Sequence, residues 1–258
     1  MKTLLVLACL CAALPAAGAR AAGWEFSSAA NYDTGKYGSK DRTDSVYIPF
    51  TLKRCYSGVD LSITVPYLRQ SSRGLVTRVG GKPVRIAAPG GSAVNSSGAG
   101  LGDIILRGAY TLKLDGPRSF DLGLAGKLKL PAASKSKGLG TGELDEGAGL
   151  EFAKEIAPGW TLLADGYYTI IGEPAGMELN NQAAVEVGFY RALLKSLGLT
   201  VLYEMQNAIV DGNAAPRSLS GTLSYGSPDG VEFAGGLTLG LSDGSPDTGI
   251  GAELNLRF

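Results

Sequence analysis

The chain has 258 residues, with 24 basic and 24 acidic side chains and 45% hydrophobic residues. It contains no histidine, which excludes Ser-His acyl transfer, histidine-based proteolysis and histidine-ligated metal centres. The balanced charge leaves no cationic excess that could neutralise phosphates, so nucleic acid is not an expected partner. We therefore expect neither an enzyme nor a protein that depends on a metal or another cofactor.

The first 21 residues have the pattern of a cleaved secretory signal. A positively charged start is followed by an apolar stretch over residues 4–14, and Ala19-Arg20-Ala21 fits the small-x-small cleavage pattern. The apolar stretch is too short to cross a bilayer core of about 30 Å as a helix. We expect a signal peptide over residues 1–21 and a single exported domain over residues 22–258.

Apolar residues at every second position run through nearly all of the remaining chain, and this is the period of β-strands. Several segments reach about ten residues, the length that a tilted strand needs to cross a membrane. The predicted strands cover residues 24–32, 46–52, 59–67, 104–114, 120–130, 148–156, 160–170, 183–189, 197–205, 219–225, 231–241 and 250–258.

The lengths of the connections separate a membrane barrel from a soluble sandwich, whose strands also alternate. From the N-terminus the connections run long, short, long, short without a break. Outer-membrane barrels have short periplasmic turns, longer outer loops and an even number of strands. The aromatic residues agree, because they gather near both ends of the strands, as in an interfacial girdle. We therefore predict an all-β fold: a transmembrane, antiparallel, up-and-down β-barrel of about 12 strands in the outer membrane of a Gram-negative envelope.

Several short motifs follow one another in a fixed order. Gly100-Leu101-Gly102-Asp103 opens a strand, and Lys127-Leu128-Lys129-Leu130-Pro131 ends one. The run over residues 138–145, GLGTGELD, follows, and then Trp160 to Tyr168 and Ile171-Gly172-Glu173. Over roughly residues 45–258 these motifs resemble the outer-membrane transporter family named after the phenol-degradation meta pathway. The resemblance implies a barrel that passes small, often aromatic, compounds, and it implies no defined binding residues.

The last strand has apolar residues at alternating positions and ends on an aromatic residue. Phe258, Leu256 and Leu254 resemble the signal that the barrel assembly machinery reads, so this machinery is an expected partner beside membrane lipid.

If the apolar rows face lipid, the alternate rows face the lumen. The charged candidates for lining the lumen are Asp103, Arg107, Lys113, Asp121, Lys127, Lys129, Glu151, Asp165, Glu186, Glu204, Glu232 and Glu253. All four basic members lie on two adjacent strands, and most of the acidic members lie on later ones. A basic wall opposite an acidic wall would orient a polar solute in a narrow passage.

Two functions remain open at this point. One is a channel for passive uptake of small molecules, including aromatic or other hydrophobic compounds, through a narrow charged lumen. The other is a non-conducting structural or surface-interaction barrel whose interior is closed by salt bridges. Twelve strands lie between the filled small barrels and the open porins, so size does not decide between them.

The longest connection, residues 69–99, contains five basic residues and no acidic one. Apolar residues flank Gly80-Gly81-Lys82-Pro83, which predicts an outward hairpin that extends the third and fourth strands. Three interpretations are open: contact with anionic lipopolysaccharide, inward folding that narrows the pore, or a solvated loop without a specific role. The residues concerned are Arg73, Arg78, Lys82 and Arg85.

A second acidic group lies in the connection that follows residue 131. Glu143, Asp145 and Glu146 offer oxygen ligands of the kind that calcium prefers. Acidic loop residues are commonly only solvated, so we expect no metal site.

Overall fold

The computed structural model describes residues 23–72, 76–79, 82–86, 96–114, 119–227 and 230–258. The predicted signal peptide and Arg73 lie outside these ranges. The described elements are β1 (Gly23–Gly35), β2 (Thr43–Cys55), β3 (Val59–Ser72), β4 (Val76–Val79), β5 (Lys82–Arg85), β6 (Ser96–Leu101), β7 (Ile104–Leu114), β8 (Phe120–Leu130), the short 3-10 helix η1 (Lys135–Lys137), β9 (Asp145–Ala157), β10 (Trp160–Ile170), β11 (Gln182–Leu194), β12 (Leu197–Gln206), β13 (Arg217–Gly226), β14 (Val231–Gly240) and β15 (Thr248–Arg257).

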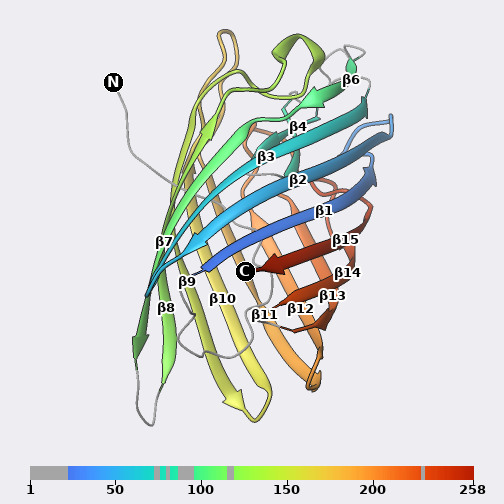
Figure 1. The fold of residues 1–258 in the computed structure, drawn as a ribbon. Helices are drawn as coiled ribbons and strands as arrows, with labels where there is room; N and C mark the ends of the chain where they lie inside the picture. The colour runs from blue at the N-terminus through green and yellow to red at the C-terminus, as the bar shows by residue number, and fades with distance from the viewer. Residues whose placement is uncertain (1–22, 73–75, 80–81, 87–95, 115–118, 228–229) are drawn as a thin grey trace.

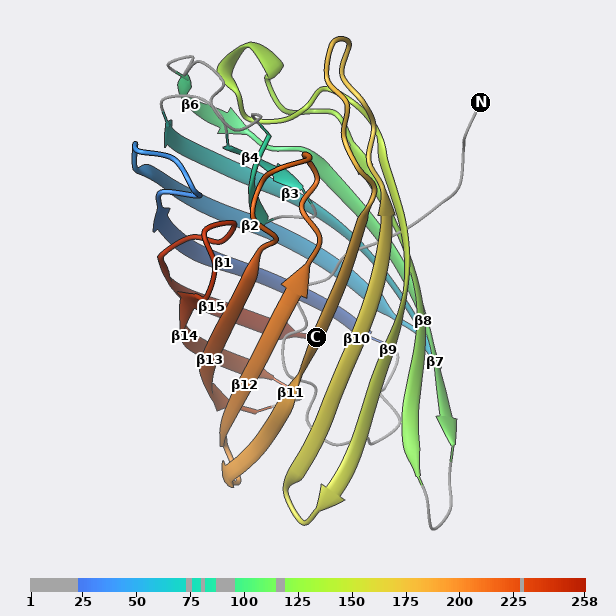
Figure 2. The same cartoon turned by 180° about the vertical axis from the view of Figure 1, so that it is seen from behind.

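The wall strands form one closed antiparallel barrel (Figures 1 and 2). Each wall strand pairs with its neighbours in sequence, and β1 pairs with β15 to close the ring. Strands β6 and β7 both pair with β3 and are separated only by Gly102 and Asp103, so together they make one wall strand. The barrel therefore has twelve wall strands, as the sequence predicted. Closure leaves no unpaired edge, which a membrane-spanning sheet requires.

Both ends of the described chain lie at the end of the barrel that carries the short turns. The backbone of Trp24 exchanges two hydrogen bonds with that of Phe258, at 2.8 and 3.0 Å. The longer connections that follow β1, β8 and β10 lie together at the opposite end (Figure 1). With the short turns in the periplasm, these longer loops are extracellular. No described helix is long and apolar enough to cross a membrane.

The outer surface of the barrel is apolar, and the side chains alternate along the strands as predicted. Leu124, Val187 and Leu239 are 49%, 41% and 52% exposed, which a water-soluble protein would avoid over so many strands. Trp24 and Tyr168, at opposite ends of the wall, are also exposed and point outward with the leucines. This surface requires lipid around it, so the chain is an integral outer-membrane barrel.

Ion pairs inside the barrel reinforce the seam between the first and last strands. Glu25 on β1 contacts Lys53 Nζ on β2 and Arg257 Nε on β15, each at 2.7 Å. Because the Glu25 side chain is only 8% exposed, little water can reach its carboxylate to replace either ion-pair partner. A single carboxylate thus connects three strands at the periplasmic end.

Replacing Glu25 with Gln is expected to destabilise the barrel by about 3 kcal/mol, because two cations lose their common partner in a shielded place. The thermal unfolding midpoint in detergent, followed by heat-modifiable gel mobility, measures this. Ser27→Ala, on the same face of β1, serves as the matched control and should change little. An unaltered midpoint for Glu25→Gln would contradict a structural role for the ion pairs.

Candidate solute passage

One side of the barrel interior, lined by β7 to β10, is filled by side chains. The Tyr167 ring lies across β9 and packs against Ala109 and Ala125, which are 8% and 5% exposed. Gly149 makes this possible, because a Cβ at that position would stand 2.1 Å from a ring carbon of Tyr167. The Tyr167 hydroxyl donates to Glu151, which also forms an ion pair with Arg107. These contacts join β7, β8, β9 and β10 across this side of the interior.

Above this layer, towards the extracellular end, lies a buried charged cluster that we call the lysine cluster. Lys129 Nζ lies 2.8 Å from Asp145 Oδ2, 3.4 Å from Asp103 Oδ2 and 3.0 Å from Thr141 Oγ1. Lys129 and the neighbouring Lys127 are each 2% exposed. The two lysines therefore face the interior but are buried there. The sequence had suggested that they form a basic wall along an open passage, and the structure does not show such a wall at Lys127 and Lys129.

The hairpin formed by β4 and β5 turns into the barrel and not outward. Arg78 Nη2 contacts Asp33 Oδ2 at 2.7 Å and donates to the Ser45 hydroxyl at 2.9 Å. The Arg78 guanidinium also lies over the Tyr47 ring, 4.4 Å from its centroid. All three partners are on the inner faces of β1 and β2. The prediction of an outward hairpin is thus wrong: β3 and β6 themselves extend the wall, and a buried ion pair draws the hairpin inside.

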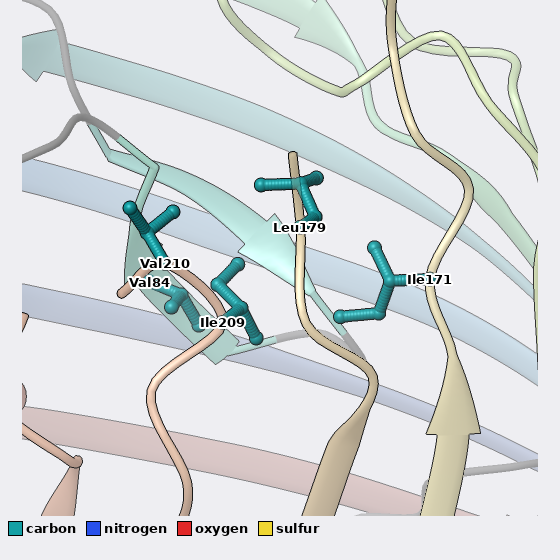
Figure 3. Packing of buried hydrophobic residues seen from close by; sticks show 5 residues of the cluster. All are labelled: Val84, Ile171, Leu179, Ile209 and Val210. Atoms are coloured by element: carbon teal, nitrogen blue, oxygen red, sulfur yellow. The ribbon is translucent and has the colours of Figure 1, made fainter. Parts of the chain in front are cut away.

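An apolar cluster holds the other side of the hairpin (Figure 3). Val84 from β5 packs with residues from the two loops that follow β10 and β12, and all five are at most 8% exposed. The members are Val84, Ile171, Leu179, Ile209 and Val210. Arg85 adds a hydrogen bond from Nη1 to the Gly38 carbonyl at 2.8 Å. Ionic and apolar contacts therefore fix the hairpin from opposite sides across the extracellular mouth.

An open space lies between this hairpin and the strands β11 to β15. It is a cavity of about 230 Å³, and its lining includes Arg78 and Pro83 from the hairpin. Small or hydroxyl side chains from the wall make up much of the rest: Ser218, Ser220, Thr222, Ala234, Gly236, Thr238, Gly249 and Gly251. Such residues on the inner face leave room that larger side chains would fill.

The charges that line the cavity are mostly acidic. Asp33, Glu186, Glu204 and Glu253 contribute carboxylates, and Arg78, which is paired with Asp33, contributes the one cation among the described lining residues. An acidic lining in a restricted space attracts cations and repels anions.

Four carboxylates stand side by side on neighbouring strands at one level of the barrel. In register, Glu151 lies opposite Asp165, Asp165 opposite Glu186, and Glu186 opposite Glu204. Like charges directly opposite one another destabilise a sheet. Glu151 is neutralised by Arg107 in the filled side, and Asp165, Glu186 and Glu204 also take part in polar or electrostatic contacts. We call Asp165, Glu186 and Glu204 the acidic row; its last two members reach the cavity.

The remaining candidates are less central. Lys113 and Lys82 belong to β7 and β5, but their side chains, like all of Arg73, lie outside the described part of the structure. Asp121 on β8 is opposite Lys113 on β7, towards the periplasmic end, and Glu232 on β14 is opposite Asn255 on β15. Phe258 is 73% exposed at the rim, with Leu256 and Leu254 leading up to it on β15.

Sequence reasoning missed several residues of the interior. Asp33 forms an ion pair with Arg78, and the Tyr47 ring lies under its guanidinium. Both residues lie on the inner rows of the first two strands, and the alternation alone assigns them to that face. Thr141 and Asp145 lie in a connection and at a strand start, where no periodicity predicts their approach to Lys129. The Asp145 carboxylate also accepts a hydrogen bond from the backbone N–H of Gly172, at 3.0 Å.

The expected absence of a metal site can be compared with the described side chains. Among residues whose placement is described, no group of three or more His, Cys, Asp or Glu residues could hold a metal ion. Asp145, one of the residues considered for calcium, instead has Lys129 Nζ and the Gly172 N–H as partners.

The architecture defines the class of this protein as an outer-membrane β-barrel. Residues 46–258 match the family described as "Putative MetA-pathway of phenol degradation", and the chain belongs to this family. The sequence resemblance to that family is thus confirmed. A search of curated proteins finds no match.

Solved structures share the fold at low sequence identity. The COG4313 outer membrane channel from Pseudomonas putida F1 is 14% identical, with a TM-score of 0.73, and the alignment covers 95% of this chain and 97% of that one. The NanC porin is 7% identical with a TM-score of 0.53, over 90% of this chain and 98% of that one. The KdgM porin in complex with disordered oligogalacturonate is 8% identical with a TM-score of 0.51, over 91% and 99%. These likenesses bear on the fold alone.

Proposed function

We propose that the protein is a passive outer-membrane channel for small solutes, without catalytic chemistry. The observation that supports this most strongly is the cavity of about 230 Å³ between the β4–β5 hairpin and the inner faces of β11 to β15. A purely structural barrel has no need of such a space, nor of a wall built from glycine, serine and threonine. The filled side and the inward hairpin make the passage narrow, so we expect a small conductance.

The lining points to the kind of solute. Glu186, Glu204 and Glu253 disfavour anions, while Tyr47, Leu202 and Pro83 offer apolar contacts to a compact ring or chain. Uncharged or cationic small molecules suit this lining, and the description of the family supports single-ring aromatic compounds among them. The acidic part of the cavity suits polar groups of a solute, and the apolar part suits an aromatic ring.

Of the interpretations of the long basic loop, we propose the constriction. Arg78 is directed at Asp33 inside the barrel, and Arg85 donates to the Gly38 carbonyl, so neither is directed at lipopolysaccharide. We also propose that the barrel assembly machinery recognises the last strand, β15, through Leu254, Leu256 and Phe258. The alternating apolar pattern and the exposed terminal ring support this proposal.

Recording from the purified barrel in planar lipid bilayers tests the channel function. We expect steady, low, cation-preferring conductance, and uptake of phenol-sized neutral solutes in a liposome swelling assay. Heat-modifiable gel mobility identifies preparations in which the barrel is folded. A folded barrel that is silent in bilayers and inert in swelling assays would favour the non-conducting structural alternative, which the filled side of the interior also suits.

A further inference from the structure

Four of the five sequence motifs that resemble the family meet at a place that the passage does not use. Asp103 ends the first motif, Lys129 belongs to the second, Thr141 and Asp145 to the third, and Gly172 to the last. All five are joined through the lysine cluster, either by side-chain contacts to Lys129 or by the Gly172 N–H bond to Asp145. Segments that are up to 69 positions apart in sequence are therefore tied together at one point.

The connection between β8 and β9, residues 131–144, lies against the inner face of the wall at this point. Its Leu139 is 2% exposed and packs with Tyr47 and Leu68, which are inner-face residues of β2 and β3. The backbone N–H of Ala133 donates to Asp103 Oδ1 at 3.0 Å. We call residues 131–144 the inner loop, because it covers the β2–β3–β6 side of the extracellular mouth.

Two glycines make room for this packing: Gly98 on β6 and Gly140 in the third motif. A Cβ on Gly98 of β6 would stand 2.8 Å from Lys137 Cβ, and one on Gly140 would stand 2.8 Å from both Ala133 Cβ and Asp103 Oδ2. A side chain at either position would separate the inner loop from the wall. Close packing against Ala133 and Asp103 therefore explains Gly140 of the third motif.

The lysine cluster makes the loop hard to release. Its charges are almost fully shielded: the side chains of Lys129, Asp103 and Asp145 are 3%, 7% and 2% exposed. Shielded charges are stable only with their partners in place, so removing one partner leaves the others unsatisfied. The inner loop is bound to these charges through the Thr141 hydroxyl on Lys129 and the Ala133 N–H on Asp103, so opening the loop breaks both hydrogen bonds.

We propose that the lysine cluster and the inner loop form a permanent seal that closes the β2–β8 side of the mouth and confines solutes to the cavity beside β11 to β15. Lys129, Asp103 and Asp145 act as positioning residues for this seal and do not touch the solute. The confinement of solutes rests on the proposed channel function, but the closed state of the inner loop can be measured independently of it.

The test uses a cysteine at Ala133, which is 8% exposed in the inner loop, in a Cys55→Ser background. Reaction of Ala133→Cys with a maleimide in the folded, detergent-solubilised barrel reports on release of the loop. Adding Lys129→Met should accelerate labelling by roughly tenfold or more, because a local opening that was rare becomes common. Lys129→Arg, which keeps the charge, should restore slower labelling.

Gly98→Val provides a second route that leaves every charge in place, since its side chain would push Lys137 and the loop away from β6. Lys135→Met is the matched control. Lys135 is in the same loop, but its side chain is 57% exposed, and its ion pair with Glu143 is a long surface contact of 3.9 Å. In bilayers, the two releasing variants should also raise conductance above that of the control. Unchanged labelling in both Lys129→Met and Gly98→Val would overturn the seal, whether or not the barrel conducts. Faster labelling with no conductance in any variant would instead count against the channel function and leave the seal supported.

Discussion

Replacing residues 76–85 with a short Gly-Ser segment should raise the single-channel conductance several-fold. The hairpin forms one side of the cavity through Arg78 and Pro83, and it crosses the mouth between the Asp33 contact and the apolar cluster around Val84. Without it, the space beside β11 to β15 would open towards the middle of the barrel. Planar-bilayer recordings of the variant and the parent at the same salt concentration measure the change.

The control for this replacement is the same Gly-Ser substitution over residues 175–178, an exposed stretch of another extracellular loop. This control should leave conductance unchanged, because these residues do not line the cavity. A hairpin replacement that folds, as judged by heat-modifiable mobility, but conducts like the parent would show that the hairpin does not limit the passage.

Reversing two charges of the acidic row should reverse the ion preference of the passage. Glu186 and Glu204 face the same cavity from adjacent strands, so Glu186→Lys combined with Glu204→Lys places two cations where two anions stood. The reversal potential in a salt gradient should change sign, and the paired Gln substitutions should give an intermediate value. The effect should weaken at high salt, because mobile ions screen the fixed charges.

Glu178→Lys is the matched control for this charge change, since Glu178 is exposed outside the cavity. Its reversal potential should remain that of the parent. The same potential in the double lysine variant and the parent would show that the acidic row does not face the ion path.

The wall of the barrel could be predicted from sequence because lipid imposes a strict period of two on every strand. Leu124, Val187 and Leu239 must point outward, so the inner or outer direction of their neighbours follows directly. The long and short connections then give the strand number and the orientation. Even the break at Gly102 and Asp103, which divides one wall strand into β6 and β7, leaves the predicted order of the strands intact.

The arrangement inside the barrel could not be predicted in the same way. Loops have no period, so nothing local determines that Arg78 turns inward to Asp33 or that Leu139 packs on Leu68. Lys129 is buried beside Thr141 of the inner loop, and the position of this loop is a tertiary property that alternation does not predict. Alternation thus predicts which residues face the interior, while packing between distant segments decides which of them meet the passage.

Cysteine accessibility during conduction tests the division of the interior most directly. In a Cys55→Ser background, Ser220→Cys places a thiol in the cavity, and Ala125→Cys places one in the filled side, where the native residue is 5% exposed. A charged methanethiosulfonate reagent should reduce the current through the Ser220→Cys barrel and leave the Ala125→Cys barrel unaffected. Block through Ala125→Cys with an unreactive Ser220→Cys would contradict a passage along β11 to β15.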